Sequence, residues 1–289
     1  MKIAALIATI VIFFSASPVD ASAKNKKMHL SGTWNQKYVE GWALDRINQS
    51  QVKLDGNRVN LSSGGAGITV YVIDTGVGAE DCNGHGTIIA DIISGDTYGI
   101  AKGAEVVSVK ALDCDGSGTE AQVISAVNWV YQNAEPETSV VNMSLIGIAS
   151  IPIDTAVNRL GALVPVVVAA GNRSSDACNF SPARASNVIA VAGFDQYNLR
   201  SIFSNHGLCV DIWAPGTAID AISKDGTRVQ KSGTSMSAAI TSGTIALIAD
   251  RDNVTTKIAA QTMISQASRP YFVDARLNGK AAYAVWVRD

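Results

Sequence analysis

Three side chains in separate segments could together turn a hydroxyl group into a nucleophile. Asp74 lies in Val-Ile-Asp-Thr-Gly, His85 in Gly-His-Gly-Thr and Ser235 in Ser-Gly-Thr-Ser-Met-Ser. An imidazole that accepts the serine proton makes the hydroxyl nucleophilic, and a buried carboxylate fixes the imidazole tautomer and stabilises its charged form. The chain therefore contains the residue types of an acyl-transfer site, in the order Asp, His, Ser.

Such a site also needs hydrogen-bond donors for the oxyanion that forms when the serine attacks a carbonyl group. Ser235 is predicted at the mouth of a helix, where its own backbone N–H lies beside the developing charge and the helix dipole helps. Asn172, which follows Ala-Ala-Gly at a predicted strand end, would supply a second donor from its side chain.

Each of these four residues also has a simpler structural explanation. Asp74 could cap a turn, His85 could be a structural histidine at a helix start, Ser235 could be an N-cap, and Gly-Asn is a turn signal. Two other kinds of site are excluded. An aspartic protease needs a second such aspartate, from a second copy or a dimer; only one copy occurs, and an all-β fold conflicts with the alternation of strand and helix patterns in this chain. A zinc site would need His-Glu-x-x-His or clustered Cys and His residues, which the sequence lacks.

The elements that must position these residues alternate between strand and helix patterns. Hydrophobic periodicity predicts strands at 68–73, 106–112, 140–143, 163–169 and 188–192, and helices at 87–93, 119–131, 153–160, 235–250 and 255–267. This alternation predicts an α/β fold with a mostly parallel central sheet and helices on both faces. Sites in such folds lie at the C-terminal ends of strands, and Asp74, Ser144 and Asn172 each follow a predicted strand.

Composition and the N-terminal segment indicate a secreted protein. Lys2, the apolar run at 3–14 and Ala21-Ser22-Ala23 predict a signal peptide over 1–23, and the apolar run itself is too short to span a membrane comfortably. We expect a short polar leader at 24–41 and one domain at 42–289. The net charge of −2 argues against nucleic-acid binding. In an oxidising compartment the four cysteines favour disulfides, and the count alone allows three pairings.

Many short motifs resemble the subtilases, within them the proteinase K group and its aqualysin-like members. Besides the three segments above, they include Ala-Leu-Asp-Arg-Ile-Asn at 43–48, Leu-Asp-Cys-Asp-Gly-Ser-Gly at 112–118, Asn-Met-Ser-Leu at 142–145 and Cys-Asn-Phe-Ser-Pro-Ala at 178–183. The resemblance covers residues 42–251. It implies a subtilisin-like fold and a secreted serine endopeptidase, active as a monomer, that needs no cofactor for its chemistry.

The resemblance also implies three further sets of residues. Protein or peptide substrates would bind as an extended strand, gripped on one edge by a strand around Gly116, Ser117 and Gly118 and on the other by Ser144 and Leu145, with Gly171 also in the binding surface. Disulfides would join Cys82 to Cys114 and Cys178 to Cys209, and a structural calcium ion would be held by Asp211 with the carbonyl groups of Ser186 and Val188.

Several departures from the family pattern favour an alternative function. The loop between Asp74 and His85 is short, Ile88 replaces a second histidine, Ile146 replaces a glycine, and Ala239-Ile240 replaces Pro-His. The leader is also too short for an inhibitory pro-domain. The alternative is a catalytically impaired, secreted binding protein on the same fold, such as a decoy for peptidase inhibitors.

Overall fold

The computed structural model describes residues 40–49, 53–56, 64–267 and 284–285, all within one compact unit that spans 33–289. The predicted signal peptide and the leader as far as residue 39 lie outside the described residues. Within the described part of the chain, no helix is both long enough and apolar enough to cross a membrane.

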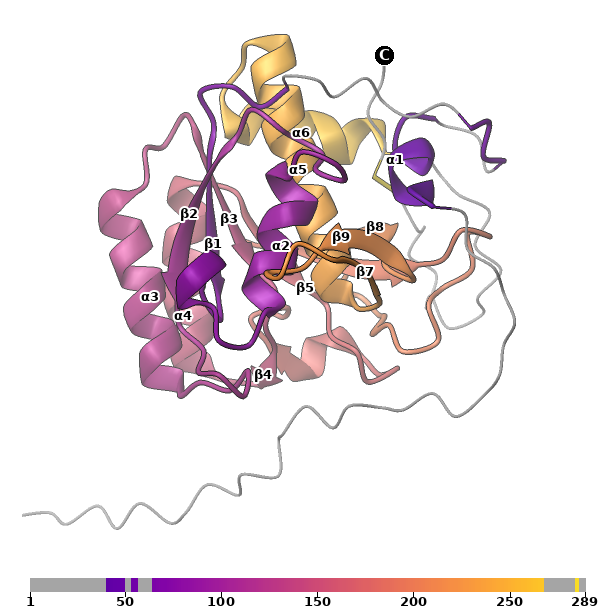
Figure 1. The fold of residues 1–289 in the computed structure, drawn as a ribbon. Helices are drawn as coiled ribbons and strands as arrows, with labels where there is room; N and C mark the ends of the chain where they lie inside the picture. Colours follow the sequence, from indigo (N-terminus) through magenta and orange to yellow (C-terminus); the bar gives the residue numbers. More distant parts are fainter. Residues whose placement is uncertain (1–39, 50–52, 57–63, 268–283, 286–289) are drawn as a thin grey trace, which may run out of the picture. The chain divides into compact units, whose positions relative to one another are not determined.

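A six-stranded parallel sheet forms the centre of the fold (Figure 1). Its order is β2-β1-β3-β5-β7-β8, with β1 at Thr69–Asp74, β2 at Glu105–Lys110, β3 at Ser139–Met143, β5 at Val166–Ala169, β7 at Ile189–Phe194 and β8 at Ile212–Pro215. The residues of β3, β5, β7 and β8 are all buried, as is typical of parallel strands that are covered on both faces. The predicted α/β class is confirmed.

Helices cover both faces of this sheet, and the strand order explains which face each one takes. The chain moves from β1 through α2 (His85–Ser94) to β2, then turns back through α3 (Glu120–Asn133) to β3 and on through α4 (Ile151–Leu163) to β5. Because crossovers between parallel strands are right-handed, this change of direction puts α2 on one face and the pair α3 and α4 on the other, as Figure 1 shows.

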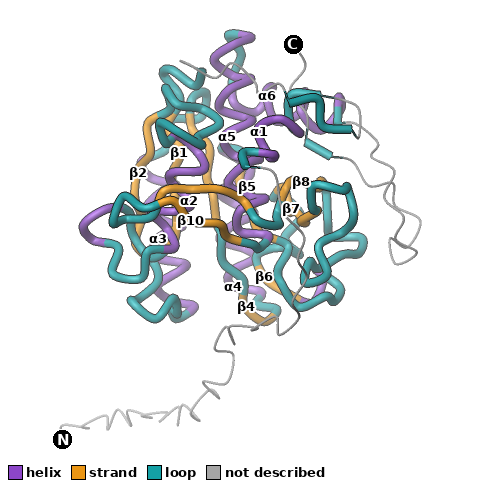
Figure 2. Tube along the Cα trace, turned by 45° about the vertical axis from the view of Figure 1, so that its right-hand side comes forward, coloured by secondary structure: helices purple, strands orange, loops and turns teal. Residues whose placement is uncertain are grey.

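Helix α5 (Thr234–Asp252) packs beside α2 and contacts β1, β3, β5, β7 and β8, so it lies along the middle of its face of the sheet. Helix α6 (Thr256–Gln266) packs on α5, and α1 (Trp42–Arg46) is a short buried helix near the start of the described chain. A hairpin of β9 (Ile219–Ile222) and β10 (Arg228–Lys231) lies beside α2 (Figure 2). The short strands β4 (Gly147–Ile148) and β6 (Phe180–Ser181) pair antiparallel.

Most predicted elements occur within a few residues of their expected bounds, with one clear error and several omissions. Thr119 caps α3 as expected, since its hydroxyl accepts from Gln122 N at 3.2 Å in a capping box. The strand predicted at 163–169 begins only at Val166, because Leu163 is the last residue of α4. Strand β8, the hairpin β9–β10 and helix α1 were not predicted.

Candidate active site

Asp74 and His85 form a hydrogen-bonded pair at the C-terminal end of β1. Asp74 is the last residue of the strand and fully buried, and its Oδ1 lies 2.7 Å from His85 Nδ1 and also accepts from the backbone N–H of Thr75 at 2.7 Å. His85 is the first residue of α2, and 31% of its side chain is exposed. A Cβ on the next residue, Gly86, would lie 2.1 Å from the carbonyl oxygen of Gly76, so only glycine lets the helix approach the strand end this closely.

The charge of Asp74 controls the protonation of this histidine. Burial lowers the pKa of His85, but the adjacent carboxylate raises it through both its charge and its hydrogen bond, and the net pKa lies above the usual value for histidine. A carboxylate that holds Nδ1 leaves Nε2 as the ring nitrogen that can exchange a proton with a nearby group.

A second buried carboxylate, Asp81, fixes the start of α2. Its Oδ1 accepts from Thr75 Oγ1 at 2.8 Å, Asn83 N at 3.1 Å and Gly84 N at 2.7 Å, and its Oδ2 accepts from the N–H and hydroxyl of Thr87 at 2.8 and 2.7 Å. Burial raises the pKa of Asp81, but these hydrogen bonds lower it by more, so its net pKa lies below the usual range. Asp81 therefore acts as an ionised clamp on the turn that carries His85.

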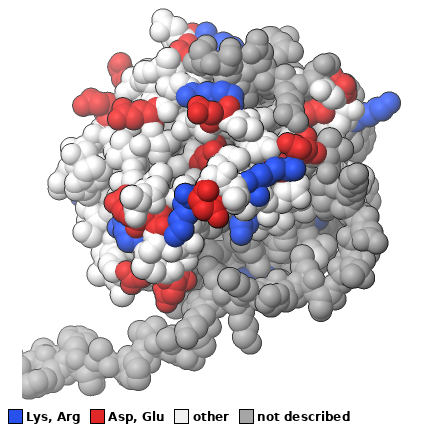
Figure 3. Space-filling view, in the orientation of Figure 1, with Lys and Arg blue, Asp and Glu red and all other residues white. Residues whose placement is uncertain are grey.

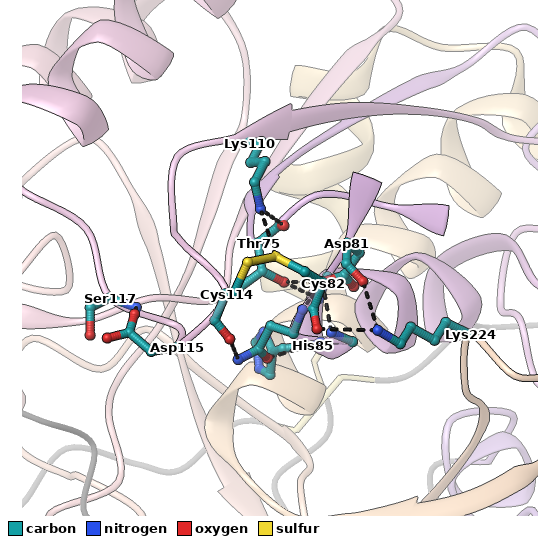
Figure 4. Close-up of a disulfide and its surroundings, with 12 residues drawn as sticks. Thr75, Asp81, Cys82, His85, Lys110, Cys114, Asp115, Ser117 and Lys224 are labelled. Carbon is teal, nitrogen blue, oxygen red and sulfur yellow. Dashed lines mark hydrogen bonds between the residues drawn. A yellow bond between two sulfur atoms is a disulfide. The ribbon is translucent and has the colours of Figure 1, made fainter. Parts of the chain in front are cut away.

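The Cys82–Cys114 disulfide ties this same turn to the loop after β2 (Figure 4). Asn83 Nδ2 donates to the carbonyl oxygen of Cys114 at 2.9 Å, and Lys224 Nζ donates to the carbonyl oxygens of Asp81 and Cys82 at 3.1 Å each. Both cysteines are exposed. The short loop between Asp74 and His85 is thus held by a covalent bond and by hydrogen bonds to two other parts of the chain, the loop after β2 and Lys224.

Ser235 is the second residue of α5, and two hydrogen bonds join it to the end of β3. The hydroxyl of Ser144 donates to the carbonyl oxygen of Ser235 at 3.0 Å, and the hydroxyl of Ser235 donates to the carbonyl oxygen of Ser144 at 3.3 Å. Ser235 is not the helix N-cap, which is Gly233, so the capping explanation of this serine is wrong. In the described structure no hydrogen bond joins Ser235 Oγ to His85.

The register of the sheet nevertheless brings the histidine and the serine to the same edge. Ile73 pairs with Met143, so Asp74 and Ser144 follow at neighbouring positions on adjacent strands. Asp74 binds His85 and Ser144 binds Ser235. In free enzymes, catalytic hydrogen bonds are often long or misaligned and tighten only in the substrate complex.

The side chain of Asn172 is oriented by the residue before Ser235. Asn172 Oδ1 accepts from the backbone N–H of Thr234 at 2.9 Å and from its hydroxyl at 3.0 Å, and the same hydroxyl accepts from Gly171 N at 3.0 Å. Because a backbone N–H can only donate, the amide oxygen must face the helix, which leaves Nδ2 pointing away. This exposed NH₂ group and the N–H of Ser235 can both donate to one oxyanion.

The structure corrects one part of the expected peptide-binding surface. Gly116, Ser117 and Gly118 do not form a strand; they belong to a turn in which Asp113 N donates to the carbonyl oxygen of Ser117 at 2.7 Å. Leu145 follows Ser144 at the end of β3 and is half-buried, whereas Gly171 is buried beside Asn172. Ser144, Leu145 and Gly171 therefore lie at the C-terminal ends of β3 and β5, where Ser235 also lies.

The second disulfide and the expected calcium ligands lie elsewhere in the chain. Cys178 is bonded to Cys209, the pairing that the family resemblance implies. Asp211 precedes β8, and its Oδ2 accepts from Ala190 N at 2.9 Å. The described residues contain no group of three or more His, Cys, Asp or Glu side chains placed to hold a metal. One carboxylate with backbone carbonyls supplies oxygen donors of the type calcium takes, and the site stays a prediction.

Two residues of this site were missed in the sequence. Asp81 stands just before Cys-Asn-Gly-His, and Asp, Asn or Ser ahead of a helix is a capping signal that could have identified it. Thr234 carries no such signal, because its partners Gly171 and Asn172 lie more than sixty residues away along the chain.

Comparisons with known proteins agree with this geometry. The model of the subtilase family of peptidases matches residues 67–282. The chain is 42% identical to an extracellular serine proteinase of Thermus sp. (strain Rt41A) over 71% of this chain and 56% of that protein. It is 39% identical to alkaline serine exoprotease A of Vibrio alginolyticus over 81% of this chain and 48% of that protein. The chain thus spans about half the length of these two relatives.

A solved structure is similar over nearly the whole described fold. The crystal structure of a cold adapted subtilisin-like serine proteinase superposes with a TM-score of 0.80 at 38% identity, covering 88% of this chain and 100% of that one. The sheet and helices described above are therefore of the subtilisin-like type.

Proposed function

The chain belongs to the subtilase family, and from this premise we propose that it is a serine endopeptidase that hydrolyses peptide bonds through an acyl-enzyme. The observation that carries this proposal is the pair of Asp74 and His85, joined at 2.7 Å at the end of β1, beside the end of the neighbouring strand β3 to which Ser235 is hydrogen-bonded. Relatives named as serine proteinases support the same reaction.

In the proposed mechanism, Ser235 Oγ turns from the Ser144 carbonyl group and attacks the substrate carbonyl carbon. His85 Nε2 accepts the hydroxyl proton as the C–O bond forms, and Asp74 stabilises the imidazolium ion. His85 then donates this proton to the departing amine as the C–N bond breaks, leaving an ester on Ser235. Water, deprotonated by the same nitrogen, hydrolyses the ester and restores the serine.

The negative charge on the substrate oxygen would be stabilised by two donors, the Nδ2 group of Asn172 and the N–H of Ser235. Their value comes from being oriented before the reaction, since donors that need no reorganisation stabilise the transition state more than the ground state. The hydrogen bonds that Thr234 makes to Asn172 supply this orientation. Subtilases need no cofactor for these steps.

We propose protein or peptide substrates that bind as an extended strand along Ser144 and Leu145 on one side and the turn at Gly116, Ser117 and Gly118 on the other. On the face shown in Figure 3, basic and acidic side chains are interspersed, so this face carries no large patch of one charge. Peptidase inhibitors that present an extended segment would occupy the same surface.

Secretion, a monomeric state and calcium binding are further parts of the proposal. N-terminal sequencing of exported protein tests cleavage after Ala23, and light scattering tests the monomer. A calcium ion at Asp211 would stabilise the loop before β7, so a melting temperature that EDTA leaves unchanged would refute that site.

A fluorophosphonate probe tests the enzyme directly. We expect one adduct, located on Ser235 by mass spectrometry, that is lost in Ser235→Ala and His85→Ala. Ser237→Ala is the matched control, because Ser237 is a buried serine of the same helix whose hydroxyl donates to the carbonyl groups of Ala214 and Pro215. A folded protein with no adduct would refute the peptidase and favour the binding-protein alternative.

A further inference from the structure

We propose that Ile146 restricts the substrate residue on the acyl side of the cleaved bond to a small side chain such as alanine. The inference rests on the proposed peptidase function, because it describes the substrate of that same site. It concerns one side chain that lies between the ends of β3 and β5.

Ile146 fills the space next to Gly171. It follows β3 by three residues and is half-buried. A Cβ built on Gly171 would lie 2.1 Å from Ile146 Cδ1, which means that the isoleucine methyl group packs directly against the Gly171 backbone. Since Met143 pairs with Val168, β3 and β5 are neighbours, and Ile146 reaches across from the end of one strand to the end of the other.

The reacting carbonyl group of a substrate must lie beside this same space. Its carbon has to come within bonding distance of Ser235 Oγ, which lies 3.3 Å from the Ser144 carbonyl oxygen, and its oxygen has to reach Asn172 Nδ2. The substrate Cα is one bond of about 1.5 Å from that carbon. The side chain on this Cα therefore starts between Ser144 on one strand end and Gly171 on the other.

The backbone around Ile146 is held in place, so a large substrate side chain cannot easily displace it. The next residue, Gly147, pairs with Ser181 in the β4–β6 ladder, and Ser150 N donates to Ser181 Oγ at 2.8 Å. Methyl or hydroxymethyl side chains fit beside Ile146, whereas an aromatic ring would compete for its volume. In a closed apolar site, one methylene group changes kcat/KM by about 10–200-fold.

The test uses two chromogenic peptides that differ only in alanine or phenylalanine before the cleaved bond. Wild type should favour the alanine peptide in kcat/KM by at least about 10-fold. Ile146→Gly should raise kcat/KM for the phenylalanine peptide by at least about 10-fold and change the alanine value by less than about 3-fold. Ile148→Ala is the control, because Ile148 is 69% exposed two residues further along, and it should leave the ratio unchanged.

Active sites are counted by fluorophosphonate labelling of Ser235, which separates the two levels of the proposal. If labelled wild type cleaves both peptides equally well, the role of Ile146 is overturned but the peptidase is not. The same holds if the alanine-to-phenylalanine ratio of kcat/KM is the same in Ile146→Gly as in wild type. Absence of both labelling and cleavage overturns the two together. If Ile146→Gly does not fold, the alanine-to-phenylalanine ratio of kcat/KM is compared between wild type and the milder variant Ile146→Ala, and an equal ratio overturns the role of Ile146.

Discussion

Replacing Thr234 with valine tests whether the orientation of the Asn172 amide limits the reaction. Valine has nearly the shape of threonine but lacks the hydroxyl that accepts from Gly171 N and donates to Asn172 Oδ1. The backbone N–H of residue 234 still donates to Asn172 at 2.9 Å. The substitution therefore removes one of two hydrogen bonds that hold the amide, without touching the triad.

The magnitude follows from the bonds that are lost. One neutral hydrogen bond contributes about 1 kcal/mol net, which corresponds to about a 5-fold change in the population of the correctly oriented amide. In subtilisin, from which this magnitude is taken, loss of the whole side-chain donor lowers kcat by about 10²–10³. We therefore expect Thr234→Val to lower kcat by about 5–10-fold, and Asn172→Ala by the larger factor, with KM nearly unchanged in both.

Stability supplies a second measurement. Gly171 is buried, so the loss of its acceptor costs about 1–3 kcal/mol of unfolding free energy. Thr244→Val is the matched control, since Thr244 is a buried threonine of the same helix whose hydroxyl donates only to the Ile240 carbonyl oxygen at 2.8 Å. Steady-state kinetics per titrated active site and denaturant unfolding measure both effects. A kcat for Thr234→Val equal to that of Thr244→Val would refute the reasoning.

Three further predictions concern the residues around His85. Because the pKa of His85 is raised, its imidazole becomes neutral only at a pH above about 6.5, the usual pKa of histidine. On the acidic limb of the pH profile, kcat/KM should therefore rise with pH through this raised pKa. Asp74→Asn should move this limb to lower pH and reduce kcat about 10⁴-fold; an unmoved limb contradicts the pairing. The stability from the pair has the opposite dependence, being full below pH 6.5 and lost as pH rises through the raised pKa. Asp81→Asn should also move the acidic limb to lower pH, because the charge of Asp81 helps to raise the pKa of His85. Identical pH profiles of wild type and Asp81→Asn would argue against that. Replacing Cys82 and Cys114 by serine should lower the unfolding free energy by about 3–4 kcal/mol, given their separation of 32 residues, and equal denaturation midpoints would exclude this.

The sequence predicted the fold class because the strands and helices differ in period and length. Thr119 with Gln122 marked a helix start correctly, since capping is a local interaction. The boundary at Leu163 was wrong because an apolar residue fits both the last turn of α4 and the first residue of a buried strand. Strand β8 was missed because its four residues end in Pro215 and offer too short a pattern.

The site was predictable in its side chains but not in their contacts. Asp74, His85, Ser235 and Asn172 were found through motifs that are local in sequence. The direction of the Asn172 amide depends on Thr234, and the hydroxyl of Ser235 bonds to a carbonyl group 91 residues away, which no local pattern records. Gly116–118 was expected as a strand, but a hydrogen bond between Asp113 and Ser117 closes it into a turn.

The burial of α5 has a consequence for the time at which activity appears. The helix is buried from Thr234 to Ala249 and touches five strands, from β1 near the start of the described chain to β8 near its end. Ribosomes release the N-terminal strands first, and contacts between distant residues form slowly because loop closure must precede them. The nucleophile therefore meets its base only when the last long helix docks on an assembled sheet. If the chain is the proposed peptidase, a nascent chain that still lacks α5 therefore carries an incomplete set of catalytic side chains.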